Sequence, residues 1–269
     1  MREAQQQLGH KSVKTTEFYL RTRAGAKVTP TERVYSTLRA QIISLELLPE
    51  TTLIRNDIAE AFSVSQSPVR EALQRLGQEG LIISYPQSRT VVSKIDLEHG
   101  PETQFLRVGV ELEVAQLLAR ADVSALLAPA SRLVHMQKLA GEDNDIGEFN
   151  TLDRLFHLSL FEAAGVRALW HFISDRSGHI DRLRRLNLPH PGKITEVVRH
   201  HADILKAIKS ANREAVEKAV RTHLSGTLAA VQKIKKRHPQ YFSRKDTSTG
   251  GCHGQLGGDV LRRHDQCRA

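Results

Sequence analysis

The sequence predicts a mainly α-helical protein in two parts, a small N-terminal unit that ends in a β-hairpin and a larger all-α antiparallel helical bundle. Three observations predict this fold class. Residues 55–76 read as two short helices around a tight turn, and residues 81–94 read as a short pair of strands. Between residues 102 and 237, apolar side chains recur every three or four positions, which is the spacing of amphipathic helices.

Composition divides the chain into four regions. Residues 1–30 form a polar N-terminal extension, and residues 31–94 and 102–237 hold the two predicted domains. Residues 238–269 are rich in Gly, Ser, Arg and His. Because this last region lacks apolar periodicity, we expect a disordered tail.

The bulk composition limits the function classes. A formal net charge of +9 suits a polyanionic partner such as nucleic acid, although a solvated basic surface would give the same charge. The two cysteines, Cys252 and Cys267, cannot build a disulfide framework for the main body. No apolar run approaches the roughly 20 residues of a membrane helix. We therefore expect a cytoplasmic protein with no membrane partner.

Residues 55–76 carry the pattern of a helix-turn-helix. The first helix ends where Ser63-Val64-Ser65 interrupts it, and Pro68 suits the first turn of the second helix. In the second helix, polar and basic side chains gather near the N-terminal end, on the face opposite the apolar positions. Such a helix suits insertion into the major groove of DNA.

A β-hairpin follows the second helix. Gly80 ends that helix, residues 81–84 and 90–93 alternate across a loop, and Arg89 lies near the tip. A generic helical hairpin beside a β-hairpin would contain the same parts. Their order along the chain is typical of a winged helix-turn-helix DNA-binding domain, which we assign to residues 31–94.

The stretch from Tyr35 to Val92 resembles the GntR-type winged helix-turn-helix. The similarity lies in YSTLRAQIISLELLPETTL at 35–53 and IAEAFSVSQSPVREALQRLGQEGLI at 58–82. The best-matched block, SPVREAL, contains Arg70. The resemblance implies that the following residues face DNA, with the last on the wing: Arg55, Ser65, Gln66, Ser67, Arg70 and Arg89.

Two positions depart from the GntR pattern. Gln66 stands where the family commonly has Arg, so a charge-assisted contact is replaced by an amide that can still pair with adenine. The wing loop, PQSRT at 86–90, lacks the usual Gly. The operator preference and the shape of the wing turn are therefore open.

Six amphipathic stripes between residues 102 and 237 predict six helices with short connections and hence a compact antiparallel bundle. The fourth stripe is predicted as one element and joins Leu169, Phe172, Ile173, Ile180 and Leu183. Two basic runs, at 182–185 and 233–237, are expected to be solvated helix faces.

Four polar side chains fall on stripes that should be buried. Asp153 and His157 are four residues apart and share a helix face. His201 and His223 each lie eleven residues from Asn212, in the turn between the last two helices, so an antiparallel hairpin brings them to the same level. Each histidine could be an ordinary hydrogen-bonded core residue. Their matching depth favours a shared site for Zn²⁺ or another divalent first-row ion.

Residues 102–236 resemble the FCD effector domain, on DRLFH at 153–157, HHADIL at 200–205 and THL at 222–224. The resemblance implies Asp153, His157, His201 and His223 as metal ligands. Zn²⁺ is the expected ion, with Ni²⁺ or Mn²⁺ as alternatives. It also implies a small carboxylate effector, for which Arg107 in LRVGVELE is the candidate ligand. His200 stands where the family usually has Glu, and we expect it to point away from the site.

The two ends of the chain carry weaker signals. Residues 8–23 resemble the end of a tyrosine recombinase, with His10 and Tyr19 at active-site positions, but the rest of a catalytic domain is absent, which predicts an inactive relic. In the tail, Cys252, His253, His264 and Cys267 could ligate zinc, but no apolar residues surround them to form a finger, so we expect no site there.

These patterns predict a ligand-responsive transcriptional regulator. We expect a homodimer that binds a pseudo-palindromic double-stranded DNA operator and senses a small carboxylate at a metal site. The main alternative is a metal-dependent enzyme that uses the Asp/His cluster. It is disfavoured because no general base or nucleophile is evident beside the ligands. A recombinase-related DNA-processing protein is the third hypothesis.

Overall fold

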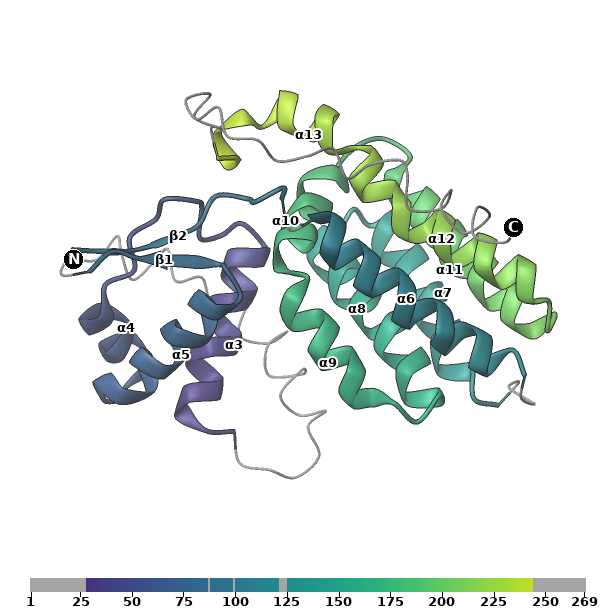
Figure 1. The fold of residues 1–269 in the computed structure, drawn as a ribbon, viewed down its shortest axis with the longest axis horizontal. Coiled ribbons are helices and arrows are strands. Elements are labelled where there is room, and N and C mark those ends of the chain that lie inside the picture. The colour runs from purple at the N-terminus through teal and green to yellow at the C-terminus, as the bar shows by residue number, and fades with distance from the viewer. Residues whose placement is uncertain (1–27, 87, 99, 121–124, 244–269) are drawn as a thin grey trace, which may run out of the picture.

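The computed structural model describes residues 28–86, 88–98, 100–120 and 125–243. A small N-terminal unit with a two-stranded sheet lies beside a larger bundle of helices (Figure 1). The predictions for His10 and Tyr19, and those for Cys252, His253, His264 and Cys267, lie outside the described residues. Within the described part, none of the helices is both long and apolar enough to span a membrane.

The N-terminal unit is a winged helix-turn-helix, as predicted. Its elements in chain order are α3 (Pro30–Ile43), α4 (Arg55–Phe62), α5 (Gln66–Gln78), β1 (Ile82–Ser84) and β2 (Thr90–Val92).

Capping and one left-handed residue define the ends of these helices. Thr29 starts α3, because its hydroxyl accepts a hydrogen bond from the Glu32 amide at 3.1 Å. Ser63 ends α4 in the left-handed conformation, at φ 51°, and so turns the chain sharply toward α5. Apolar side chains of α3, α4 and α5 then form one core, which includes Val34, Ile42, Val69 and Leu76.

The wing is a short antiparallel hairpin. Ile82 pairs with Val92 and Ser84 with Thr90, whose side-chain hydroxyls lie 3.1 Å apart. The Tyr85 amide donates to the Arg89 carbonyl at 2.8 Å, which closes the loop without the glycine that is usual in the family. Arg89 therefore lies at the end of the wing, as predicted.

Within the described residues, eight α-helices follow the wing. They are α6 (Gly100–Leu118), α7 (Ala128–Glu142), α8 (Ile146–Ala163), α9 (Arg167–Arg176), α10 (Gly178–Asn187), α11 (Lys193–Lys209), α12 (Arg213–Ala229) and α13 (Val231–Arg237).

The prediction of six helices was wrong in two places. The fourth predicted helix is split, because Ser177 ends α9 and Gly178 begins α10. Ala230 separates α12 from the short α13. As a result, Leu169 and Phe172 on α9 are 44% and 49% exposed, although their spacing placed them in the core.

Gly178 permits close contact between the two units. A Cβ atom at this position would lie 2.8 Å from Leu81 Cδ2, and Leu81 is fully buried at the end of the first unit. The split between α9 and α10 therefore coincides with the point where the bundle meets the winged domain.

Helix α10 and its basic run lie in this contact between the two units (Figure 1). The expectation that residues 182–185 form a solvated face was wrong. Arg182 is fully buried, and the side chain of Arg184 is only 13% exposed. Arg182 is bound by backbone carbonyls of the first unit, and Arg184 by carboxylates within the bundle, so neither remains in water.

The predicted tail at 238–269 begins too early. Residues 239–241 form a 3₁₀ turn, η1 (Pro239–Tyr241), and Phe242 is 2% exposed. The Ile95 amide donates to the Tyr241 carbonyl at 2.8 Å, so the end of the described chain packs on the segment that joins the two units. Burial of the Phe242 ring, which composition alone did not reveal, explains this order.

Substituting Gly178 tests the close contact between the units. Gly178→Ala is expected to lower the free energy of unfolding by about 1–3 kcal/mol, because the added methyl group overpacks against Leu81. Gly77→Ala is the matched control, since a Cβ atom there meets nothing within 4 Å. Denaturant unfolding followed by circular dichroism measures both. Equal stability of the two variants would contradict the packing described.

Candidate metal centre and nucleic-acid interface

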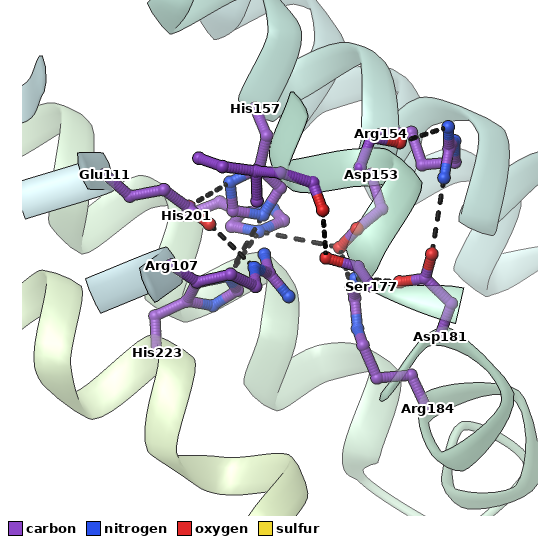
Figure 2. Close-up of polar contacts among 12 residues, drawn as sticks. Arg107, Glu111, Asp153, Arg154, His157, Ser177, Asp181, Arg184, His201 and His223 are labelled. Carbon is purple, nitrogen blue, oxygen red and sulfur yellow. Dashed lines mark hydrogen bonds and ion pairs between the residues drawn. The ribbon is translucent and has the colours of Figure 1, made fainter. Parts of the chain in front are cut away.

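Three of the predicted metal ligands meet inside the bundle. His157 lies on α8, His201 on α11 and His223 on α12, and their rings turn toward one another in Figure 2. His223 Nε2 lies 3.2 Å from His157 Nε2 and 3.3 Å from His201 Nε2. The prediction that the α11–α12 hairpin brings His201 and His223 to the same height agrees with the 3.3 Å between their Nε2 atoms.

Two buried hydrogen bonds orient the imidazoles. His157 Nδ1 lies 2.8 Å from Glu111 Oε2, and His201 Nδ1 lies 2.8 Å from Gln137 Oε1. Because both partners are acceptor oxygens, each Nδ1 carries a proton, and a neutral ring then presents its Nε2 lone pair to the centre. A proton on His223 Nε2 cannot fully satisfy both lone pairs, whereas a cation would engage all three nitrogens.

The electrostatics keep the ligating groups in the forms that bind metals. Burial lowers the pKa of His201 and of His223 well below the usual histidine value, so these rings are neutral. Burial alone would raise the pKa of Glu111, but Arg107 and His157 outweigh it and lower that pKa to about 2. The cluster therefore combines two neutral imidazoles, His201 and His223, with an ionised carboxylate, Glu111, that contacts His157.

Two separations within the histidine cluster match those between neighbouring ligands of a tetrahedral ion. Zinc–nitrogen bonds of about 2.0–2.1 Å place two tetrahedral ligands roughly 3.3–3.4 Å apart. The observed separations from His223 are 3.2 and 3.3 Å. The three side chains each offer a nitrogen within 4.8 Å of the other two, so they are candidates to hold one metal ion.

Asp153, the fourth predicted ligand, lies beside the cluster but is bound by another group. Its Oδ1 is 3.6 Å from His201 Nε2 and 2.5 Å from the guanidinium of Arg184 on α10. Burial would raise the pKa of Asp153, but Arg184 and the histidines outweigh it, so the pKa lies below its usual range. Asp153 is therefore an ionised carboxylate that Arg184 and the histidine cluster share.

A small cavity opens next to His223. It has a volume of about 20 Å³, room for roughly one water molecule. Arg107, the predicted effector ligand, lines it and is bound to Glu111 at 2.8 Å. Its remaining polar lining consists mainly of cations and imidazoles, namely Arg184, Lys193, His200 and His223.

The expectation that His200 points away from the site was wrong. Its side chain is buried and lines the same cavity, with its ring centroid 6.1 Å from that of His223. It does not join the three converging nitrogens. His200 precedes His201 on α11, so its side chain leaves the helix in a different direction. It therefore lies outside the three converging nitrogens but still lines the neighbouring cavity.

The predicted DNA-facing residues are all exposed on the winged domain. Ser65, Gln66, Ser67 and Arg70 lie at the start of α5, Arg55 begins α4, and Arg89 is on the wing. The side-chain amide of Gln66 donates to Asn56 Oδ1 at 2.7 Å, which ties the start of α5 to α4.

Three arginines of this set face one groove. Arg55, Arg70 and Arg89 line it together with Gln74 and Tyr85. The groove continues toward the bundle, where Lys94, Asp96 and His179 also line it. The surface that would read DNA is thus continuous with the contact between the two units.

Sequence reasoning missed three residues around the histidine cluster. Glu111 was detectable, because it lies four residues after Arg107 on the same helix face. Gln137 gave no signal, since nothing near it marks a buried amide. Arg184 was hidden within a basic run that resembled a solvated surface.

The fold and the exposed basic helix define a DNA-binding transcriptional regulator. Family models match the GntR family of bacterial regulatory proteins at residues 30–92 and the FCD domain at residues 102–226. The chain therefore belongs to the GntR family and carries an FCD effector domain, as the sequence motifs predicted. The relatives are regulators, so the chain is not an enzyme.

Individual relatives agree with this assignment. An HTH-type transcriptional regulator in an unstable DNA locus of Streptomyces ambofaciens is 33% identical over 78% of this chain and 88% of that protein. The transcriptional repressor RspR of Escherichia coli is 29% identical over 80% of this chain and 94% of its own length. Escherichia coli McbR has a similar fold, with a TM-score of 0.66, 23% identity and coverage of 77% of this chain and 99% of its own.

Proposed function

We propose that this regulator binds a pseudo-palindromic operator as a homodimer and senses a small carboxylate at a divalent metal held by the bundle. The observation that carries the proposal is that Nε2 of His157 and of His201 each lie 3.2–3.3 Å from His223 Nε2, while hydrogen bonds at Nδ1 orient the His157 and His201 rings. His157, His201 and His223 would hold the ion, with Asp153 as the fourth ligand, and Zn²⁺ suits three imidazoles and one carboxylate. Such an ion supplies a positive centre to which a carboxylate ligand can bind.

The cavity beside the histidines supports an anionic effector. Arg107, Lys193 and His200 line it on the side of His223. Because Arg107 is already paired with Glu111, a bound carboxylate would meet a cation that is oriented in advance. The cavity has room for about one water molecule, so a larger ligand would displace the side chains that line it.

Two exposed apolar stripes support a homodimer. Phe105 is 84% exposed and Leu117 is 44% exposed on α6, with Gly109 and the exposed Glu113 between them at four-residue spacing. Leu169 and Phe172 are about half exposed on α9, which contacts α6. A second copy related by a twofold axis would cover both stripes and place two recognition helices on two half-sites.

Removing Arg70 tests the DNA interface. Arg70→Ala is expected to weaken binding to a duplex selected by the wild-type chain from a random library by roughly 5- to 150-fold, the equivalent of 1–3 kcal/mol. Arg221→Ala on α12 is the matched control, because Arg221 is exposed and forms a surface ion pair with Glu217. Fluorescence anisotropy measures both, with circular dichroism as a check on folding. Unchanged binding by Arg70→Ala would refute the interface.

Elemental analysis tests the metal centre. Purified protein is expected to hold about one divalent ion per subunit, and the double variant His157→Ala/His223→Ala to hold none, since two of three converging ligands are lost.

Glu111→Gln is expected to lower zinc affinity about 10- to 100-fold, because it removes the carboxylate behind His157. Glu142→Gln on α7, whose side chain is 58% exposed, is the control. Equal zinc affinity of the two glutamine variants would contradict this arrangement.

A charge on the exposed stripe tests the dimer. Phe105→Glu is expected to raise the dimer dissociation constant at least tenfold, because an unpaired charge in the interface costs more than the roughly 1.4 kcal/mol of that factor. Leu139→Glu on α7, where the leucine is 46% exposed, is the control. Sedimentation equilibrium gives both constants. A monomeric wild-type chain, or an unaffected Phe105→Glu dimer, would contradict the proposal.

A further inference from the structure

Helix α10 touches both the metal centre and the winged domain. Arg184 binds Asp153 at 2.5 Å, and Asp181 accepts from Arg154 at 3.3 Å, so one side of α10 is tied to α8 (Figure 2). Two residues before Arg184, Arg182 extends to the first unit and contacts Ser93, the residue directly after β2. One helix of ten residues therefore joins the two sites.

Arg182 has an unusual environment for a guanidinium. It is fully buried, and its Nη1 donates to the Ser93 carbonyl at 2.7 Å while its Nη2 lies 3.2 Å from Ser93 Oγ and 2.9 Å from His179 Nδ1. Within the described residues, no carboxylate forms an ion pair with it, and burial lowers its pKa to about 10. Its charge is balanced by directional hydrogen bonds, which depend closely on the position of α10.

The contact at Ser93 leads directly to the recognition helix. Ser93 Oγ donates to the Gly80 carbonyl at 2.6 Å, and the Ser93 amide donates to the Leu81 carbonyl at 2.9 Å. Gly80 and Leu81 follow the end of α5, whose N-terminal half carries the exposed Ser67 and Arg70. A continuous series of contacts thus runs from Asp153 through Arg184, α10, Arg182 and Ser93 to the end of α5.

The same helix is anchored on its apolar side. Leu183 and Leu186 of α10 pack with Ile95 of the connecting segment and with Phe242. The Asp96 amide donates to His179 Nδ1 at 3.0 Å. The connecting segment is therefore bound to α10 at several points, which leaves it little freedom to move independently of that helix.

We infer that Arg182 is a positioning residue that couples the histidine centre to the recognition helix. This inference rests on the proposed metal site and operator binding. The Asp153 carboxylate lies between Arg184 and the histidine cluster. If Asp153 turns toward a metal bound by the histidines, its ion pair with Arg184 weakens, and α10 loses one of its contacts with α8. Arg182 passes the change to Ser93 and hence to the orientation of α5. Without Arg182, the histidine centre still binds its metal and the winged domain still binds DNA, but metal binding no longer changes the affinity for DNA.

The experiment measures the effect of zinc on operator affinity. A duplex selected from a random library serves as the DNA probe, and fluorescence anisotropy gives its Kd for the full chain with Zn²⁺ and with a chelator. In the wild-type chain, Zn²⁺ is expected to change this Kd by roughly 5- to 150-fold, in whichever direction. In Arg182→Met the change is expected to fall below about twofold, while zinc binding, measured by calorimetry, stays within about threefold of wild type. Arg221→Met is the matched control and should respond like the wild type.

A conservative variant separates coupling from folding. Arg182→Lys keeps the charge but cannot reproduce the planar set of donors, so its response to zinc should lie between those of the wild type and Arg182→Met. If Arg182→Met fails to fold, Arg182→Lys and Ser93→Ala test the inference in its place. In both variants Zn²⁺ should change the operator Kd less than it does in the wild-type chain.

Two outcomes would overturn the inference while leaving the proposed function intact. One is an undiminished zinc response in folded Arg182 variants. The other is a wild-type chain that binds both zinc and the duplex, with neither affecting the other. A wild-type chain that binds no zinc in calorimetry contradicts the proposed metal site itself, so the two kinds of failure are distinguishable.

Discussion

The buried hydrogen bonds from His157 to Glu111 and from His201 to Gln137 fix which face of each imidazole meets the centre of the bundle. With both Nδ1 atoms committed to oxygens, the Nε2 lone pairs converge on His223 at 3.2–3.3 Å. Without a cation, a single proton on His223 Nε2 would have to serve both lone pairs in a buried space, which leaves one of them poorly satisfied. The surrounding helices are arranged around this constraint: α6, α7, α8, α11 and α12 each supply one residue of the cluster or its hydrogen bonds.

The charges around the centre are balanced in pairs. Arg107 neutralises Glu111, and Arg184 neutralises Asp153, so two carboxylates stay ionised deep in the bundle. Asp153 is the less committed of the two, because it also faces His201. This shared carboxylate lies next to α10, the helix that packs on the winged domain. The site that would hold a ligand and the contact between the two units are therefore physically adjacent.

The sequence was sufficient for the regular parts of the fold. Ser63 and Pro68 marked the turn of the helix-turn-helix, and periodicity located most helices. It failed at Ser177 and Gly178, because a helix break without proline leaves the apolar spacing almost unchanged. It also failed at Phe242, whose burial depends on a distant segment around Ile95 that no local pattern reveals.

Prediction of the site succeeded where spacing alone fixed geometry. The equal distance of His201 and His223 from Asn212 was enough to bring them together, and the i, i+4 pair of Asp153 and His157 was enough to place both near the cluster. Arg184 could not be predicted as a partner of Asp153, because a basic run on a helix gives no sign of which members are buried. His200 was misplaced for a related reason, since neighbours on a buried helix can reach different walls of one cavity.

Anomalous X-ray diffraction at the zinc edge, from crystals of the full chain grown with Zn²⁺, tests the account most directly. The account predicts one strong peak per subunit at about 2.0–2.1 Å from Nε2 of His157, His201 and His223. A peak elsewhere on the protein, or none at the centre of these three rings in a zinc-saturated crystal, would contradict it.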